Sequence, residues 1–207
     1  METLYEAQAF ILSAAKVPWG DYGHVLTHGM SKHLNRRNGH IQLERTGPFI
    51  PPITFPGVGD LVVTDAIRRE LEGQDFSGLQ FSAIDLVHIV NLNWETWDMQ
   101  AKEPQMLPPG GEPEAYILKN AHDPASASAL GELWEGTVRA WGRSTSELIG
   151  RRPIKYRVTL TSESDSIPDF FRADGARYIF VSLRAREWLE RAVGSWVAFE
   201  RVTFTSE

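Results

Sequence analysis

Four of the six histidines lie close together near the N-terminus, where they could bind a metal ion. His24 and His28 are four positions apart and would share one face of a helix, as zinc ligands often do, and His33 and His40 follow. Glycines interrupt this stretch, and no glutamate lies between His24 and His28 as the zinc-protease motif requires. We therefore expect surface or loop histidines and no metal. A metal-dependent hydrolase using His24, His28 and His33 is the alternative.

Two carboxylates in the segment WETWD offer a second kind of chemistry. Glu95 and Asp98 could act as an acid/base pair beside Trp94 and Trp97, as in a sugar-binding cleft. However, Trp94 continues the apolar face of the preceding predicted strand, residues 84–94. We expect most of the tryptophans to be structural, and a carboxylate-dependent hydrolase at Glu95 and Asp98 stays an alternative.

Composition excludes several other classes of site. The chain has no cysteine, which excludes disulfides, thiolate zinc sites and a cysteine nucleophile. The serines lack the G-x-S-x-G motif of a hydrolase nucleophile. No apolar run approaches the roughly 18 residues of a membrane span. The first residues, METLYEAQAF, carry acids and not the basic start of a signal peptide, so we expect a cytoplasmic protein. We also expect no cofactor.

The net charge of −6 is unevenly distributed. Residues 51–150 hold six Lys and Arg against fifteen Asp and Glu, a balance of −9, whereas residues 1–50 sum to +1 and residues 151–207 to +2. Nucleic-acid-binding proteins usually present a basic surface, so we expect no nucleic-acid partner. A basic protein partner fits the acidic middle segment, because complementary charge steers association. The alternative is that these acids only keep the surface soluble.

One pattern occurs twice, 118 positions apart, in residues 59–84 and 176–204. Each copy predicts a strand, a hydroxyl residue as helix N-cap, a short amphipathic helix, a glycine and a second strand. The matched pairs are Val63 and Val181, Thr64 and Ser182, Arg68 and Arg186, Leu71 and Leu189, Glu72 and Glu190, and Phe81 and Phe199. The prediction is an α+β fold with two related β-α-β units and mixed sheets. The repeat is either a duplication or a coincidence of two similar units.

The remaining elements are predicted from periodicity and turn residues. We predict a helix over residues 2–16, strands over 41–45, 84–94 and 154–162, and a turn-rich link over 162–175. Asp123 is expected to cap a helical turn that begins at Pro124. His88 falls on the apolar face of its strand and is expected to be a core histidine.

Domain boundaries are predicted from the same patterns. The expected organisation is an N-terminal half, residues 1–103, a Pro/Gly-rich connection with short helical segments, residues 104–153, and a second β-α-β unit, residues 154–207. One continuous globular domain is the alternative to this division.

The closing stretch, RYIFVSLRAREWLERAVGSWVAFERVTF, resembles the C-terminal end of bacterial immunity proteins encoded beside polymorphic toxins. It is also similar to the tail of the myxobacterial double-CXXCG proteins, although the cysteines of that motif are absent here. The resemblance covers about half of the chain and consists mainly of hydrophobic scaffold positions. It therefore carries over no catalytic residue. It implies a binding role, in which the protein blocks a cognate toxin by direct contact.

An exposed loop is the expected contact surface for such a partner. The segment MQAKEPQMLPPGGEPEAY, residues 99–116, contains four prolines, paired glycines and several acids. In and beside it, aromatic residues that could anchor a partner lie among acidic residues. The predicted contact residues are Trp97, Asp98, Glu103, Glu112, Glu114 and Tyr116. The alternative is that this loop only connects two halves of the protein.

Overall fold

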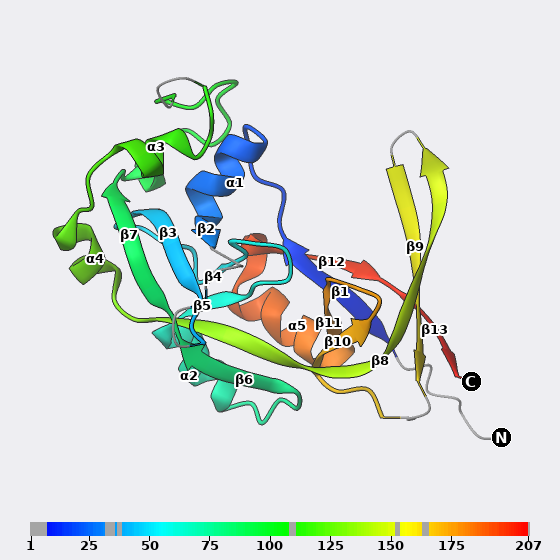
Figure 1. The fold of residues 1–207 in the computed structure, drawn as a ribbon. Helices are drawn as coiled ribbons and strands as arrows, with labels where there is room; N and C mark the ends of the chain where they lie inside the picture. The colour runs from blue at the N-terminus through cyan, green and yellow to red at the C-terminus, as the bar shows by residue number, and fades with distance from the viewer. Residues whose placement is uncertain are drawn as a thin grey trace. The chain divides into compact units, whose positions relative to one another are not determined.

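The computed structural model describes residues 8–31, 36, 39–107, 111–151, 154–162 and 166–206 (Figure 1). The fold is α+β, and its sheets are mixed, because β10 pairs in parallel with β8 and antiparallel with β11. In chain order the elements are β1 (Ala9–Ala14), α1 (Asp21–His28), β2 (Met30–Ser31), β3 (Gln42–Gly47), β4 (Ile53–Thr54), β5 (Val62–Thr64), α2 (Asp65–Glu72), β6 (Leu79–Ala83), β7 (Asp85–Asn91), η1 (Trp94–Thr96), α3 (Ala115–Lys119), α4 (Pro124–Leu130), β8 (Leu133–Arg151), β9 (Ile154–Ser162), β10 (Phe170–Asp174), β11 (Ile179–Ser182), α5 (Leu183–Ala192), η2 (Gly194–Trp196), β12 (Val197–Arg201) and β13 (Thr203–Ser206).

The chain forms two compact units, and each is assembled from segments that are distant in sequence. Unit 1 contains residues 1–13, 71–80 and 137–207, and unit 2 contains residues 14–70 and 81–136. The long strand β8 contributes its first four residues to unit 2 and the rest to unit 1. Sequence proximity therefore does not define either unit.

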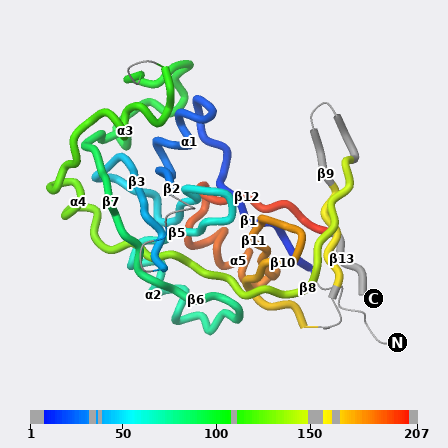
Figure 2. Tube along the Cα trace, in the orientation of Figure 1, coloured from blue at the N-terminus to red at the C-terminus, as the bar shows by residue number. Residues whose placement is uncertain are grey.

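In unit 1, the strands follow the order β12-β1-β11-β10-β8, and β9 pairs with both β8 and β13. Figure 2 shows the blue N-terminal strand β1 among the orange and red C-terminal strands. A buried apolar cluster in this unit combines residues of the four strands β1, β9, β10 and β11 with Val202, which lies between β12 and β13. Its members are Ala9, Ile11, Val158, Leu160, Phe171, Ala173, Phe180 and Val202.

Unit 2 contains two groups of strands. β5 pairs with β4 and with the start of β8, and β3 lies between β2 and β7. The helix α1 contacts β3, and α3 and α4 each contact both β3 and β7. Leu43, Val62 and Leu133 form a buried cluster, with Ile84 and Leu86 packed against it. Apolar side chains from strands and helices thus close this core.

Both copies of the repeated pattern form the predicted strand, helix and strand. The first copy is β5, α2 and β6, and the second is β11, α5 and β12. Ser182 is the N-cap of α5, and its Oγ accepts a hydrogen bond from the Ala185 N–H at 3.2 Å, as predicted. The matching cap by Thr64 stays a prediction.

The structure extends the repeat to a third strand in each copy. Both strands of the first copy pair with β8, and both strands of the second copy pair with β1. The registers agree, because Val63 faces Trp134 on β8, and its counterpart Val181 faces Phe10 on β1. β1 precedes the second copy in the chain, whereas β8 follows the first, so sequence comparison of the two copies does not find this equivalence.

The matched arginines occupy the same place in the two copies. The Arg68 guanidinium lies 4.4 Å from the ring centroid of Trp134, and the Arg186 guanidinium lies 4.6 Å from that of Phe10. In each copy, therefore, an arginine on the helix stacks on an aromatic ring of the central strand. This contact explains why arginine recurs at a position of no evident chemistry.

Two sequence predictions are wrong. The predicted helix over residues 2–16 is a strand where the structure describes it, β1, with Phe10 and Ile11 buried as expected. A short apolar run is compatible with a buried strand as well as with a helix. Here the segment forms a strand because its backbone pairs with β11 and β12. The turn-rich link over residues 162–175 contains β10, whose Phe170 and Phe171 are fully buried.

Other predicted elements are confirmed. The strands β3, β6, β7 and β9 occur where the alternation predicted them. Asp123 caps α4 by accepting a hydrogen bond from the Ser126 N–H at 3.1 Å, and Pro124 begins that helix. His88 is half-buried and its Nε2 donates to the Asn120 carbonyl at 3.0 Å, so it is hydrogen-bonded but not a core residue.

Candidate partner-binding surface

The proline-rich segment between η1 and α3 is held in place by two aromatic side chains of unit 2. The indole Nε1 of Trp19 donates to the Ala101 carbonyl at 2.9 Å. The Tyr22 hydroxyl donates to the Met106 carbonyl at 2.7 Å. Burial, together with the nearby Tyr116, raises the pKa of Tyr22 to about 12, so this hydroxyl keeps its proton. These two hydrogen bonds fix the backbone of the segment at Ala101 and Met106.

Trp97 belongs to the core of unit 2. It is 9% exposed, and its ring centroid lies 6.1 Å from that of Trp19. The ring therefore helps to position the anchoring residue Trp19 and is not available as an exposed anchor. Trp94, which is 2% exposed and packs edge-on against Phe49, is also structural.

The four predicted acidic contact residues are exposed, and Tyr116 is half-buried at the second position of α3. Asp98 accepts a hydrogen bond from the Gln100 N–H at 2.9 Å, which shapes the turn at the start of the segment. The exposed acids are Asp98, Glu103, Glu112 and Glu114.

Apolar side chains are exposed among these acids, which the sequence analysis did not predict. Met106 is 46% exposed, Leu107 is 63% exposed, and Leu118 on α3 is 59% exposed. We call the described residues 98–107 and 111–118 the acidic loop surface. It combines negative charge with exposed apolar area on a backbone tied down by Trp19 and Tyr22, a combination that suits protein binding.

The expectation of surface or loop histidines is wrong for His24 and His28, which lie on the helix α1, the first half-buried and the second buried. The rings of His24 and His28 lie 4.7 Å apart, and His28 is 1% exposed. Its Nδ1 accepts a hydrogen bond from the Phe55 N–H at 3.4 Å. Burial, His24 and Arg45 lower the pKa of His28 to about 3, so this ring is neutral.

The geometry around these histidines does not assemble a ligand set. Among the residues that the structure describes, no three His, Asp or Glu side chains come together as a metal site. His33 lies outside the described residues. Glu95 is exposed in η1 and Asp98 is exposed beside it in the sequence.

Arg45, which sequence reasoning missed, is fully buried in unit 2. Its Nε donates to the Thr46 carbonyl at 2.9 Å, and another guanidinium nitrogen donates to the carbonyls of Thr27 and Phe49 at 3.4 Å each. Burial lowers its pKa to about 9. Because Thr27 lies in the last turn of α1, the cation also faces the negative end of that helix. This is a structural role.

A second unpredicted group surrounds Asp169 in unit 1. Its carboxylate accepts from the Ser77 N–H and hydroxyl at 3.0 Å each, from the Ser182 hydroxyl at 2.8 Å and from Arg184 at 3.1 Å. Burial raises the pKa of Asp169, but these hydrogen bonds outweigh it and hold the pKa below its ordinary value. The network joins the turn before β6, the start of β10 and the N-terminus of α5.

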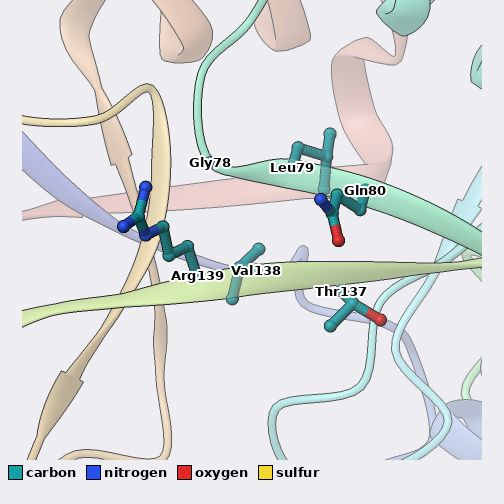
Figure 3. Close-up of a pocket in the computed structure, with 6 residues that line it drawn as sticks. All are labelled: Gly78, Leu79, Gln80, Thr137, Val138 and Arg139. Atoms are coloured by element: carbon teal, nitrogen blue, oxygen red, sulfur yellow. The ribbon is translucent and has the colours of Figure 1, made fainter.

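Unit 1 also contains a pocket of about 270 Å³ over β6 and β8 (Figure 3). It is lined by Gly78, Leu79, Gln80, Thr137, Val138 and Arg139. Gly78 has φ +83°, and a Cβ there would lie 2.1 Å from the Phe170 carbonyl oxygen, so only glycine fits. None of the predicted contact residues lines this pocket.

Comparison with protein-family models, curated proteins and solved structures gave no match. No helix among the described residues is long and apolar enough to cross a membrane. The candidate surface is therefore supported by its own geometry and not by a known relative.

Proposed function

We propose that the protein is a non-catalytic binding protein of the immunity type, which neutralises a cognate bacterial toxin by direct contact through the acidic loop surface. The observation that supports this proposal is the anchored loop itself. Trp19 and Tyr22 bond its backbone at Ala101 and Met106, while the acids and three apolar side chains remain exposed. Backbone that is already fixed at these two residues loses less entropy when a partner binds.

Charge specifies the kind of partner. The acidic loop surface lies within residues 51–150, which sum to −9. Such a surface attracts a basic protein and speeds its association, whereas the exposed apolar side chains lose water on contact and slow dissociation. A basic toxin domain that acts on nucleic acid has the complementary charge. The hydrolase alternatives are supported by no specific contact among the described residues.

The test is binding to a purified toxin domain encoded by a neighbouring gene. We expect a stoichiometric complex and loss of toxin activity. The variant Asp98→Lys, Glu112→Lys, Glu114→Lys should associate more slowly and show a weaker dependence on salt. In the matched control variant, three exposed acids of unit 1 are replaced by lysine: Asp174, Glu187 and Glu200.

Two results would count against the proposal. If the loop variant and the control variant bind and protect equally well, the acidic loop surface is only a solvated face. If no neighbouring gene encodes a toxin domain that this protein binds, the immunity role is wrong as well.

A further inference from the structure

Three polar side-chain atoms in the interior of unit 2 have no hydrogen-bond partner among the residues that the structure describes. They are Arg45 Nη1, His28 Nε2 and Thr27 Oγ1. Arg45 and Thr27 are fully buried, and His28 is 1% exposed. Buried polar groups are nearly always hydrogen-bonded, so three such atoms require a partner that the side chains around them do not supply, such as an ion or water.

The three unpartnered atoms come from two elements that are in contact. Thr27 and His28 are the last two residues of α1, and Arg45 lies on β3. The Arg45 guanidinium donates through Nη2 to the Thr27 carbonyl at 3.4 Å, and a Cβ on Gly29 would lie 2.8 Å from the Cβ of Arg45. Burial, His24 and Arg45 lower the pKa of His28, so the guanidinium also acts on that ring. The three atoms therefore belong to one buried region.

All three atoms can donate a hydrogen bond. A guanidinium nitrogen donates and never accepts. His28 Nδ1 accepts a hydrogen bond from the Phe55 N–H at 3.4 Å, so the proton of the neutral ring is on Nε2, which therefore donates. The Thr27 hydroxyl can donate as well. The partner that satisfies this region is consequently a hydrogen-bond acceptor.

Charge distinguishes between the possible acceptors. Burial lowers the pKa of Arg45 to about 9, so the guanidinium is still a cation at neutral pH. The carbonyls of Thr46, Thr27 and Phe49 bond its Nε and Nη2 and offset part of the charge. Within the described parts of the chain, no Asp or Glu forms an ion pair with it. A buried charge without a counter-ion is strongly destabilising, so an acceptor that is itself negative is favoured over water.

We propose that unit 2 binds a small monovalent anion of the chloride class, held by Arg45 Nη1 with His28 Nε2 and Thr27 Oγ1 as the further donors. The ion is the counter-ion of the buried guanidinium and joins the end of α1 to β3. Its small size follows from the complete burial of Arg45 and Thr27, which excludes a side chain of a partner protein. The site contains no residue of the acidic loop surface and does not rest on the toxin-binding role.

The dependence of stability on chloride tests the proposal. The full-length protein is unfolded with urea in about 1 to about 200 mM sodium chloride, and sodium gluconate, whose anion is too large for an enclosed site, keeps the ionic strength constant. An ion that binds only the folded protein raises the folding equilibrium constant. Above the Kd, that constant should increase about tenfold for each tenfold increase in chloride concentration. A constant value over the whole range would overturn the proposal.

Substitution of the donors tests which residues hold the ion. Arg45→Met removes the charge and should abolish the chloride dependence. Thr27→Val removes one hydroxyl at nearly constant shape and should raise the Kd for chloride about tenfold. Thr54→Val is the matched control, because Thr54 is equally buried in unit 2 but its hydroxyl donates to the Val62 carbonyl at 3.5 Å, so the Kd should keep the parent value. Equal Kd values for the two valine variants would exclude Thr27 as a donor to the ion.

Bromide locates the ion directly and requires no variant, so this result stands even if Arg45→Met does not fold. Crystals of the parent protein grown in sodium bromide should show anomalous scattering within hydrogen-bond distance of Arg45 Nη1. Absence of that signal, together with stability that does not depend on chloride, would mean that water satisfies the three donors. Each of these results is independent of whether the acidic loop surface binds a toxin.

Discussion

At the residue scale, one half-buried carboxylate joins several segments of unit 1 through hydrogen bonds. The Asp169 carboxylate accepts five hydrogen bonds from Ser77, Ser182 and Arg184. Arg184 also donates to the carbonyl of Asp75 at 3.1 Å and lies 4.6 Å from the ring centroid of Phe76. One carboxylate therefore joins three segments that the chain brings from residues 74–77, 169 and 182–184.

The variant Asp169→Asn should lower the free energy of unfolding by about 3 kcal/mol, because several charge-assisted hydrogen bonds weaken together. Urea denaturation measures this. Asp174→Asn, at an exposed position of the neighbouring strand, is the control and should change stability by less than about 0.5 kcal/mol. Equal effects of the two substitutions would mean that the network adds nothing to the fold.

The same carboxylate gives a pH dependence of known sign. The folded-state pKa of Asp169 is below its ordinary value, so its contribution to stability is full above the unfolded-state pKa of about 3.9. That contribution is lost as the pH falls through the folded-state value. The difference in unfolding free energy between the parent and Asp169→Asn should therefore shrink from pH 6 to pH 3. A constant difference would exclude titration of Asp169 as the cause.

Substitutions at Trp97 and Leu107 should distinguish a residue that packs in the core from one that contacts the partner. Trp97→Ala should destabilise the protein by about 3–5 kcal/mol, because the ring is 9% exposed and packs on Trp19. Leu107→Ala removes a side chain that is 63% exposed and should leave stability within about 0.5 kcal/mol. Under the proposed function, Leu107→Ala still raises the dissociation rate of the toxin complex. Thermal melts and binding kinetics on both variants check this.

At the element scale, the two copies of the β-α-β pattern share a strand partner, a register and a stacked arginine. Val63 and Val181 face aromatic residues of β8 and β1, and Arg68 and Arg186 cover those rings. The arginine stem buries apolar area while its guanidinium pairs with a carboxylate on the same helix, Asp65 in α2 and Glu190 in α5.

Replacing either matched arginine by lysine should lower the stability of the β-α-β unit that contains it. Arg68→Lys and Arg186→Lys should each cost about 0.5–1 kcal/mol, because an ammonium group keeps the charge but loses the planar stacking surface. Arg191→Lys on the exposed side of α5 serves as the control. Equilibrium unfolding would contradict the equivalence of the copies if only one of the two substitutions has an effect.

At the scale of the whole molecule, the N-terminal segment completes a sheet that the C-terminal segment cannot complete alone. β1 lies between β11 and β12, and its residues Ala9, Phe10, Ile11 and Leu12 are buried. Without it, both neighbouring strands would expose unpaired backbone groups and apolar side chains. The sheet of unit 1 therefore requires strands from both the N-terminal and the C-terminal segments of the described chain.

Deletion of residues 1–14 should abolish hydrogen-exchange protection of β11 and β12 amides. A synthetic peptide of residues 8–16, added in trans, should restore part of it, whereas a scrambled peptide of the same composition should not. Undiminished protection in the deletion variant would show that β1 is dispensable for unit 1.

The sequence by itself determined those features that depend on neighbouring residues. The strand, helix and strand of each repeat, the caps Ser182 and Asp123, and the exposed acids of the 98–116 segment follow from local periodicity, capping chemistry and turn residues. These patterns need no knowledge of the partner segment.

The tertiary structure alone decided features that depend on contacts between distant segments. β1 is a strand because β11 and β12 flank it, Trp97 is buried because Trp19 covers it, and the charge of Arg45 is tolerated because three carbonyls surround it. A short apolar run or a single charged residue has no preferred environment of its own, and the free energy of long-range packing selects one.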